Sequence, residues 1–266
     1  MKNDALGLVH SIADPTDRLN VLREYIQALI LRSLHESQAF TSIAFFGDTA
    51  LRFLFNLPRF SEDLDFSLEL EKEYRPVVWM QKIKRDLQFQ GYEVSISWND
   101  RSAVHVAWVG IPHLLKEAGL SGHSEEKLSV KLEFDTNPPK GAVCASTLIN
   151  RHTLFAVRHY DLPSLMAGKV NALLTRSFCK GRDWYDLVWY RSRRPPVEPN
   201  LELLRNALAQ QGVHLDGDWR TLVRDRIKHT EFEVITKDVA PFLESHEDAK
   251  LLRPEYITAL LEEGLG

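Results

Sequence analysis

One stretch, residues 43–66, constrains the fold of this chain more than any other. Residues 43–46 form a short apolar run that ends at Gly47, and residues 49–55 then carry apolar side chains at helical spacing. From Asp63 onward, acidic or polar residues alternate with apolar ones, which is the pattern of a half-buried strand. The stretch therefore predicts a strand, a tight turn, a short helix and a second strand.

The second strand carries two carboxylates, Asp63 and Asp65, on one face. They are expected about 6–7 Å apart along the strand, and like charges this close cost free energy unless something compensates them. Mg²⁺ would compensate them, because it typically binds one or two carboxylates together with substrate phosphates. The pair therefore predicts a magnesium site, and the alternative is an outer strand face with two solvated acids.

Gly47 stands between the predicted strand and the predicted helix. A glycine at this point lets the backbone approach a ligand closely, and the start of the following helix presents free N–H groups suited to phosphate. A phosphate cradle followed by paired carboxylates meets the needs of nucleotidyl transfer, since one element holds the phosphates and the other holds the metals. We therefore expect a nucleotide site here.

Three motifs occur in order along the chain: Gly47-Asp48-Thr49-Ala50-Leu51, Arg59-Phe60-Ser61-Glu62-Asp63-Leu64-Asp65-Phe66 and Arg182-Asp183-Trp184-Tyr185-Asp186-Leu187. Together they resemble the AbiEii/AbiGii toxin family of nucleotidyltransferases, which includes type IV abortive-infection toxins and the related MenT enzymes. The resemblance covers residues 40–190. It implies a nucleotidyltransferase-like mixed sheet with flanking helices, followed by a helical C-terminal region, which is an α+β fold.

One position departs from the family pattern, because Asp48 stands where the family has its second glycine. An acidic side chain beside a phosphate cradle repels a triphosphate. Alternatively, Asp48 joins the metal shell or caps the following helix. The departure bears directly on nucleotide affinity and on activity.

The resemblance also implies a third carboxylate from an adjacent strand. Residues 127–134 alternate as a strand, and Glu133 is the expected third acid, with Asp135 as the alternative. This acid acts as general base on the attacking hydroxyl or completes the metal shell. The metal ligands expected are Asp63, Asp65 and Glu133.

By the same resemblance, a lysine contacts the nucleotide phosphates and an aspartate of the last motif is needed for activity. These correspond to Lys169 and Asp183, with Lys180 as a competing lysine, and Arg182 pairs with Asp183 or with substrate. Lys169 lies off the apolar stripe of the helix predicted to start at Pro163. The residues expected to hold the nucleotide are Gly47, Asp48, Thr49, Ser61, Lys169, Lys180 and Arg182.

The resemblance implies Mg²⁺ as cofactor, an NTP as co-substrate, an RNA such as a tRNA end as acceptor, and a cognate antitoxin encoded nearby. Transfer to a protein or a small molecule is the rival within the enzyme class. The alternative from another class is a degenerate, non-catalytic member that binds a nucleotide or a partner.

Composition indicates the type of chain and the cellular compartment in which it is expected. With 266 residues, 44% hydrophobic and 26% charged, the chain is of ordinary globular type. No run approaches about 18 apolar residues, and no apolar segment of a signal peptide follows the first residues. Cys144 and Cys179 are expected to be free thiols. We therefore expect a cytoplasmic protein with no membrane partner.

Charge is uneven along the chain. The formal net charge is −4, yet residues 151–194 hold nine lysines and arginines against three acidic residues. Such a segment indicates an anionic ligand, either a triphosphate or RNA. The alternative for residues 191–194 is a solvated loop.

The turn cluster at residues 137–141 is the best internal boundary. We expect residues 1–140 to form the nucleotidyltransferase core, with a bracing helix over residues 15–39 that Asp14 or Thr16 caps. Residues 141–266 are expected to form a mostly helical domain that contributes the lysine and aspartate motif.

Overall fold

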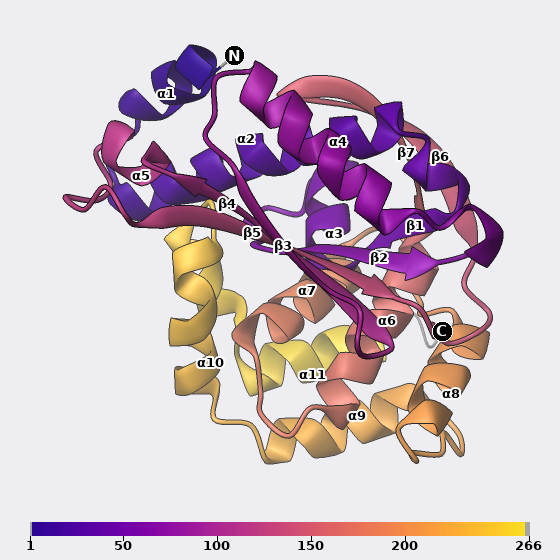
Figure 1. Cartoon of the computed structure of the whole chain (residues 1–266). Helices are drawn as coiled ribbons and strands as arrows, with labels where there is room; N and C mark the ends of the chain where they lie inside the picture. The colour runs from indigo at the N-terminus through magenta and orange to yellow at the C-terminus, as the bar shows by residue number, and fades with distance from the viewer. Residues whose placement is uncertain (1, 264–266) are drawn as a thin grey trace. The chain divides into compact units, whose positions relative to one another are not determined.

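The computed structural model describes residues 2–263 and divides them into two compact units, each described here by itself. Unit 1 comprises the residues up to Asn56, Phe60–Pro138 and Cys144–His159. Unit 2 comprises Leu57–Arg59, Pro139–Val143 and the residues from Tyr160 onward. The sheet belongs to unit 1, and unit 2 is helical (Figure 1).

Within the described residues, the strands of unit 1 form one seven-stranded mixed sheet with the order β3-β4-β5-β2-β1-β7-β6. The strands are β1 (Ile43–Phe46), β2 (Leu64–Leu68), β3 (Ser95–Asn99), β4 (Val104–Pro112), β5 (Lys127–Asp135), β6 (Cys144–Arg151) and β7 (Thr153–Tyr160). Strand β2 runs antiparallel to β1 and parallel to β5. The expected α+β class with a mixed sheet is confirmed.

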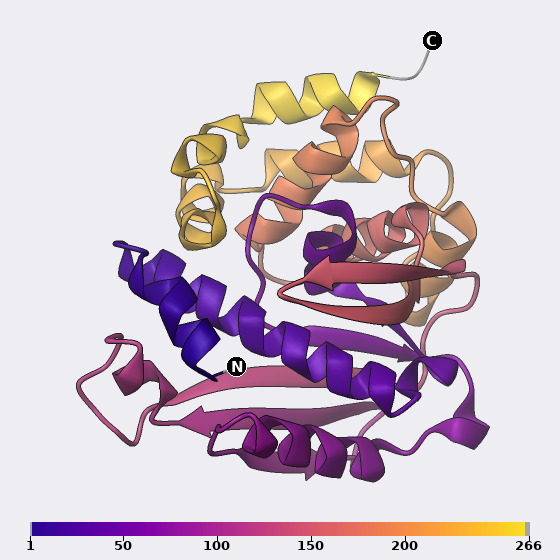
Figure 2. The same cartoon turned by 90° about the horizontal axis from the view of Figure 1, so that it is seen from above.

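Helices α2 and α4 cover the apolar face of this sheet (Figures 1 and 2). The helices of unit 1 are α1 (Lys2–His10), α2 (Pro15–Glu36), α3 (Gly47–Phe55), α4 (Pro76–Phe89) and α5 (Leu114–Glu117), with 3₁₀ turns at Ala39–Thr41 and Glu71–Glu73. Asp14 caps α2 by accepting hydrogen bonds from the N–H groups of Thr16 and Asp17, as expected. The α2 helix ends at Glu36, close to its predicted end.

The two faces of β5 differ in burial, because its side chains alternate between them. Its even-numbered residues are buried and apolar, and Trp79 of α4 packs against Phe134. The odd-numbered residues from Ser129 to Asp135 are half-buried and polar. Strand β2 follows this alternation from Leu64 to Phe66, whereas Ser67 is also buried. The two strands thus give the sheet an apolar face under the helices and a more polar face opposite.

Unit 2 consists of helices, as expected for the C-terminal region. They are α6 (Leu162–Thr175), α7 (Gly181–Ser192), α8 (Leu201–Gln210), α9 (Trp219–Lys228), α10 (Phe232–Val239) and α11 (Pro254–Glu262), with 3₁₀ segments at Ala240–Phe242 and His246–Leu251. Asp161 caps α6, and Pro163 lies in its first turn. Gly181 lets α7 pack directly on α10, since a Cβ there would overlap the carbonyl of Ile235.

Strands continue beyond residue 140. The sequence predicts a mostly helical region there, but β6 and β7 occupy residues 144–160 and extend the sheet. In β7 the residues from Phe155 to His159 alternate between buried and half-buried, which is a strand period. The domain boundary at residue 140 stays a prediction.

The structure describes the state of the two cysteines and the suitability of the helices for crossing a membrane. Both Cys144 and Cys179 are free thiols, as expected. In the part of the chain that the structure describes, the helices lack the combination of length and apolar character that crossing a bilayer requires.

A buried carboxylate ties the elements around α3 together. Glu24 of α2 is 5% exposed and accepts hydrogen bonds from Arg52 at 2.6 Å, Arg151 at 3.0 Å and His152 at 3.0 Å. Burial alone would raise its pKa, but the hydrogen bond from His152 and the charges of Arg52 and Arg151 outweigh burial and lower the pKa of Glu24 to about 2.

This pKa predicts how stability depends on pH. Because the pKa of Glu24 in the folded protein lies below the ordinary glutamate value of 4.5, its contribution to stability is complete above about pH 4.5 and is lost as pH falls toward 2. We expect Glu24→Gln to remove about 3 kcal/mol of this pH-dependent stability. Urea unfolding between pH 7 and pH 3 checks this: the variant should lose less stability on acidification than the wild type. The exposed control Glu125→Gln should follow the wild type, and equal acid sensitivity of all three proteins would contradict the assignment.

Candidate nucleotide and metal site

The turn between β1 and α3 is built around Gly47. Its φ of +79° lies in the left-handed region, and a Cβ at this position would overlap the carboxylate of Asp65. Phe46, the last residue of β1, pairs with Asp65 across the sheet. Only glycine therefore allows the chain to turn directly beside the second acid of the carboxylate pair.

Thr49 fixes the first acid of the pair. Its buried hydroxyl donates a hydrogen bond to the main-chain carbonyl of Asp63, so the first turn of α3 is fastened to the entry of β2. The buried amide of Gln27 reinforces this entry by donating to the carbonyls of Ser61 and Glu62, at 3.0 and 2.9 Å. The hydroxyl of Thr49 and the carbonyl of Ser61, both expected near the nucleotide, thus position the acids.

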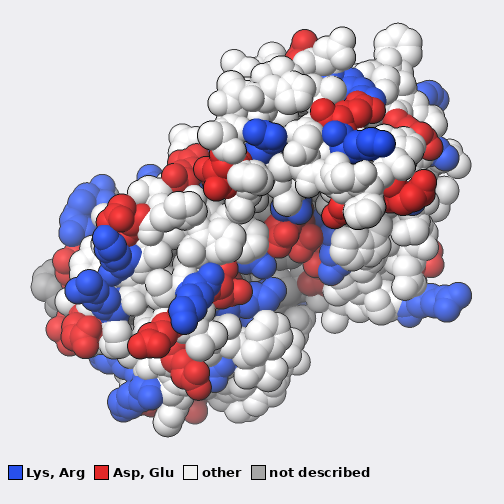
Figure 3. Space-filling model, turned by 90° about the vertical axis from the view of Figure 1, so that its left-hand side faces the viewer, with Lys and Arg blue, Asp and Glu red and all other residues white. Residues whose placement is uncertain are grey.

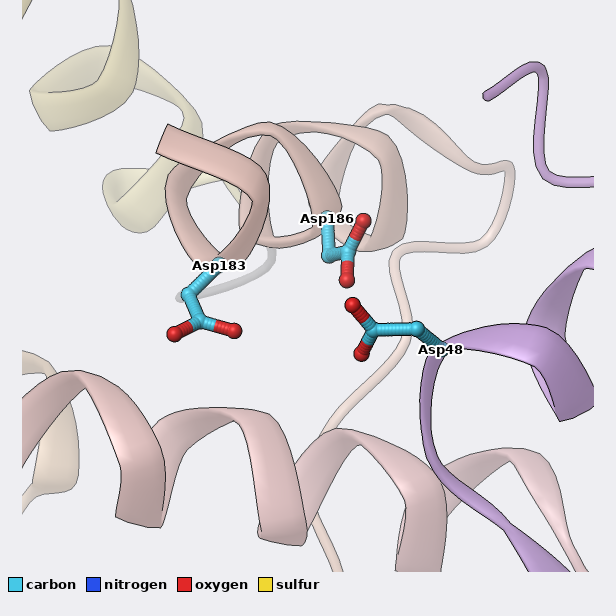
Figure 4. A group of neighbouring side chains, drawn as sticks. All are labelled: Asp48, Asp183 and Asp186. Atoms are coloured by element: carbon cyan, nitrogen blue, oxygen red, sulfur yellow. The ribbon is translucent and has the colours of Figure 1, made fainter. Parts of the chain in front are cut away.

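Asp48 does not cap α3, contrary to one of the two alternatives for this residue. Phe46 occupies the N-cap position and makes no side-chain cap hydrogen bond, while Asp48 is the acidic residue of the first helical turn (Figure 4). A negative charge in the first turn interacts favourably with the helix dipole. It also opposes the binding of a phosphate at the same helix start.

The register between β2 and β5 sets two of the three expected acids opposite each other. Asp65 pairs directly with Glu133, and Leu64 pairs with Leu132. Residues opposite each other point to the same face of the sheet, and Asp63 precedes β2 by one residue and shares the alternation of Asp65. The polar face therefore carries all three.

Lys131 is the cation of this group. Its Nζ lies 2.7 Å from Glu133 Oε1. Burial would lower the pKa of Lys131, but the hydrogen bond to Glu133 and the charges of Glu133, Asp63 and Asp65 raise it. Lys131 thus lies in the electric field of all three carboxylates.

Asp135, the alternative third acid, lies farther along β5. It pairs with Ser67 rather than with Asp65, and its carboxylate accepts the N–H of Asn137 at 2.9 Å. Burial raises the pKa of Asp135, which disfavours the charged form that a metal needs. These observations favour Glu133 as the third acid.

The donor set of Asp63, Asp65 and Glu133 fits Mg²⁺ in its chemistry, because Mg²⁺ prefers carboxylate oxygens and these three share one half-buried face. In the described residues, their oxygens do not all lie within 4.8 Å of one another. Glu133 is instead turned to Lys131. The ammonium of Lys131 is thus a cation already paired with one of the three carboxylates, that of Glu133.

Comparison with known proteins identifies the family of this chain. Residues 29–261 match the family described as nucleotidyl transferase AbiEii toxin, type IV TA system. The chain belongs to this family. A search of curated proteins finds no match.

Two crystal structures from Helicobacter pylori share the fold of this AbiEii family member. One is a candidate nucleotidyltransferase, with a TM-score of 0.56 and 18% identity over 92% of this chain and 96% of that chain. The other is JHP933, with a TM-score of 0.50 and 18% identity over 91% of this chain and 92% of that one. At this identity the likeness concerns the fold.

In unit 2, Lys169 is held between two aspartates of the last AbiEii motif. Its Nζ lies 2.9 Å from Asp183 Oδ1 and 2.8 Å from Asp186 Oδ2. The two aspartates lie one turn apart on α7 (Figure 4). Lys169 is 7% exposed, so the expectation that it lies off the buried stripe is wrong. Burial is tolerated because the two carboxylates compensate its charge.

Arg59, from the second motif, completes this cluster. Its guanidinium donates two hydrogen bonds of 2.6 Å to the carboxylate of Asp186, and both side chains are fully buried. Arg176 pairs with Asp183 from the more exposed side. The sequence alone indicates no role for Arg59 or Asp186, and the signal that it offers is that each stands in one of two separate motifs.

The remaining expected residues lie around α7. Lys180 occupies its N-cap position, with Nζ 5.7 Å from the ring centroid of Phe178. The guanidinium of Arg182 lies 4.3 Å from the ring centroid of Phe242. Arg182 thus lies over an aromatic ring. The carboxylate of Asp183 forms its ion pairs with Lys169 and Arg176.

The surplus of basic residues at positions 151–194 is partly internal. Lys169 and Arg191 are buried, and Arg191 pairs with Glu198. On the face drawn in Figure 3, basic and acidic side chains are interspersed. The count of nine basic residues along the sequence therefore includes two that are buried.

We expect Gly47→Ala to cost about 1–3 kcal/mol, since it places a side chain at positive φ and displaces Asp65. Urea unfolding measures this cost. Gly7→Ala is the matched control, because its position in α1 is open to a Cβ and alanine favours a helix. Equal stability of Gly47→Ala and wild type would contradict the close approach.

The cluster around Lys169 makes a second test. Removing one partner of a buried ion pair typically costs about 3–5 kcal/mol, so Lys169→Met should destabilise the protein by that order. Arg176, whose side chain is 38% exposed, is the control: Arg176→Met should cost about 1 kcal/mol or less. Chemical unfolding of both variants decides, and a Lys169→Met protein as stable as the wild type would exclude a structural part for this lysine.

Proposed function

We propose that this AbiEii family member is a cytoplasmic, Mg²⁺-dependent nucleotidyltransferase that transfers NMP from an NTP to an RNA acceptor such as a tRNA end. The observation that carries the proposal is the Gly47 turn packed against Asp65, with Glu133 opposite Asp65 in register. This arrangement supports the proposal, because it sets a helix start, whose free N–H groups suit phosphate, beside carboxylates from two neighbouring strands of unit 1, whose oxygens suit Mg²⁺.

In this proposal, the N–H groups at the start of α3 bind the phosphates, and Asp63, Asp65 and Glu133 are the metal ligands. Bound Mg²⁺ would offset the negative charge of the attacking and leaving oxygens. The acceptor hydroxyl attacks the α-phosphorus, the bond from this phosphorus to the bridging oxygen breaks, and pyrophosphate leaves with the electron pair. Glu133 accepts the hydroxyl proton.

Lys169 and Asp183 take the parts that the family resemblance gives them. Lys169 steadies the charge that develops on pyrophosphate, and Asp183 orients the ammonium through its 2.9 Å hydrogen bond. Lys180 and Arg182 are further candidates for phosphate contact. The type IV TA description of the family supports a cognate antitoxin as partner.

The test is transfer of label from each α-labelled NTP to total RNA in Mg²⁺. We expect labelled RNA with wild type and with Asp216→Ala, an exposed loop control. Asp63→Ala/Asp65→Ala should lower the rate at least about a hundredfold, since metal-ion stabilisation is worth several kcal/mol.

Three results would count against the proposal in different ways. Undiminished transfer by the double variant would remove the two acids from the mechanism. Label in protein or a small molecule would replace RNA as acceptor. No label anywhere, from folded wild type, would favour a non-catalytic binding protein, and Asp48 beside the phosphate cradle is the feature that supports this second function.

A further inference from the structure

Lys131 lies on the polar face of the sheet, beside the carboxylate of Glu133. It lies on β5 two residues before Glu133, and its ammonium pairs with that carboxylate at 2.7 Å. Because Leu64 pairs with Leu132, Asp63 falls beside the position of Lys131 one step along the two parallel strands. The ammonium is thus set among the three acids proposed to bind metal.

A second neighbour lies on the other side of Lys131. Trp108 of β4 pairs directly with Lys131, and its ring centroid lies 5.8 Å from the ammonium. The side chain of Lys131 is 25% exposed and that of Glu133 is 30% exposed. The ammonium can therefore leave Glu133 for solvent or for the ring face of Trp108, where a cation is attracted.

We propose that Lys131 is a built-in cation that holds the place of the metal on this face and makes metal binding depend on nucleotide. The proposal rests on the proposed function. A bare divalent ion has to displace the ammonium from Glu133 and is repelled by it. A metal that arrives with a triphosphate brings phosphate oxygens that accept the displaced ammonium. Lys131 thus weakens binding of the metal alone and strengthens binding of the metal together with nucleotide.

An ordinary half-exposed ion pair would behave differently. Such a pair contributes little to stability, and removal of its positive charge would favour binding of the metal alone without weakening binding of the metal together with nucleotide. If Lys131 holds the place of the metal, removal of its charge instead has two opposite effects: the metal alone binds more tightly, and the metal together with nucleotide binds less tightly. This opposition makes the proposal testable without measuring transferase activity.

The experiment is titration of the protein with Mn²⁺, following free Mn²⁺ by electron paramagnetic resonance, with and without a non-hydrolysable NTP analogue. We expect Lys131→Met to bind Mn²⁺ alone about threefold or more tightly than wild type. With the analogue present, Lys131→Met should bind Mn²⁺ less tightly than wild type does. Lys131→Arg keeps the charge and should restore the wild-type pattern. Lys127→Met is the matched control: Lys127 lies on the same face of β5, but at the start of the strand, whereas Lys131 pairs with Glu133. This variant should therefore resemble wild type.

Unchanged or weaker binding of Mn²⁺ alone by Lys131→Met would overturn the proposal. If that variant does not fold, Lys131→Gln carries the same test. Asp63→Ala/Asp65→Ala separates the two proposals. Loss of Mn²⁺ binding in this double variant supports the metal site, whereas full retention would contradict the proposed function itself, whatever Lys131 does.

Discussion

The organisation of unit 1 depends on one electrostatic constraint: like-charged side chains gathered on one face of a sheet must be held and compensated. The parallel register of β2 and β5 sets Asp65 opposite Glu133. A slip by one residue would turn these acids toward the apolar core. The packing of Phe66 against Phe134, with ring centroids 5.0 Å apart, opposes such a slip. The apolar core thus fixes the arrangement of the charges.

The local elements around the acids serve the same arrangement. Gly47 provides space for Asp65, and Thr49 binds the carbonyl of Asp63. Lys131 supplies positive charge to Glu133. Backbone geometry in this chain thereby explains the glycine and the threonine of the first AbiEii motif.

In unit 2, charged side chains are buried together in ion pairs. Arg59 and Lys169 face Asp183 and Asp186 with ion-pair distances of 2.6–2.9 Å, so charges of opposite sign compensate one another away from water. Breaking such a group is costly, and its geometry is correspondingly well determined. A lysine fixed in this way is oriented before any substrate binds, as a residue with the proposed role of Lys169 requires.

Local patterns predicted the local structure. The alternation around Asp63, the position of Gly47 and the cap at Asp14 each depend on neighbours within a few residues, and the structure has the expected strand, turn and helices there. Contacts between distant residues were not accessible in this way. Arg59 and Asp186 are 127 positions apart, and no periodicity indicates that they pair.

Two expectations failed for related reasons. The apolar spacing along the helix from Pro163 leaves Lys169 out of the buried stripe, and its burial is explained by two carboxylates on another helix, which that spacing does not indicate. Strands β6 and β7 were missed because they follow a turn cluster that resembles a domain boundary. Their place in the sheet is set by pairing of β7 with β1, as between His159 and Phe45, far earlier in the chain.

In the function proposed for this protein, Asp63 and Asp65 on the polar face of unit 1 bind a divalent cation. Anomalous scattering from a crystal grown with Mn²⁺ and a non-hydrolysable NTP analogue locates that cation. We expect an anomalous peak coordinated by Asp63 and Asp65, with the analogue's phosphates at the start of α3. A clear peak elsewhere on the protein, with Asp63 and Asp65 uncoordinated, would contradict it.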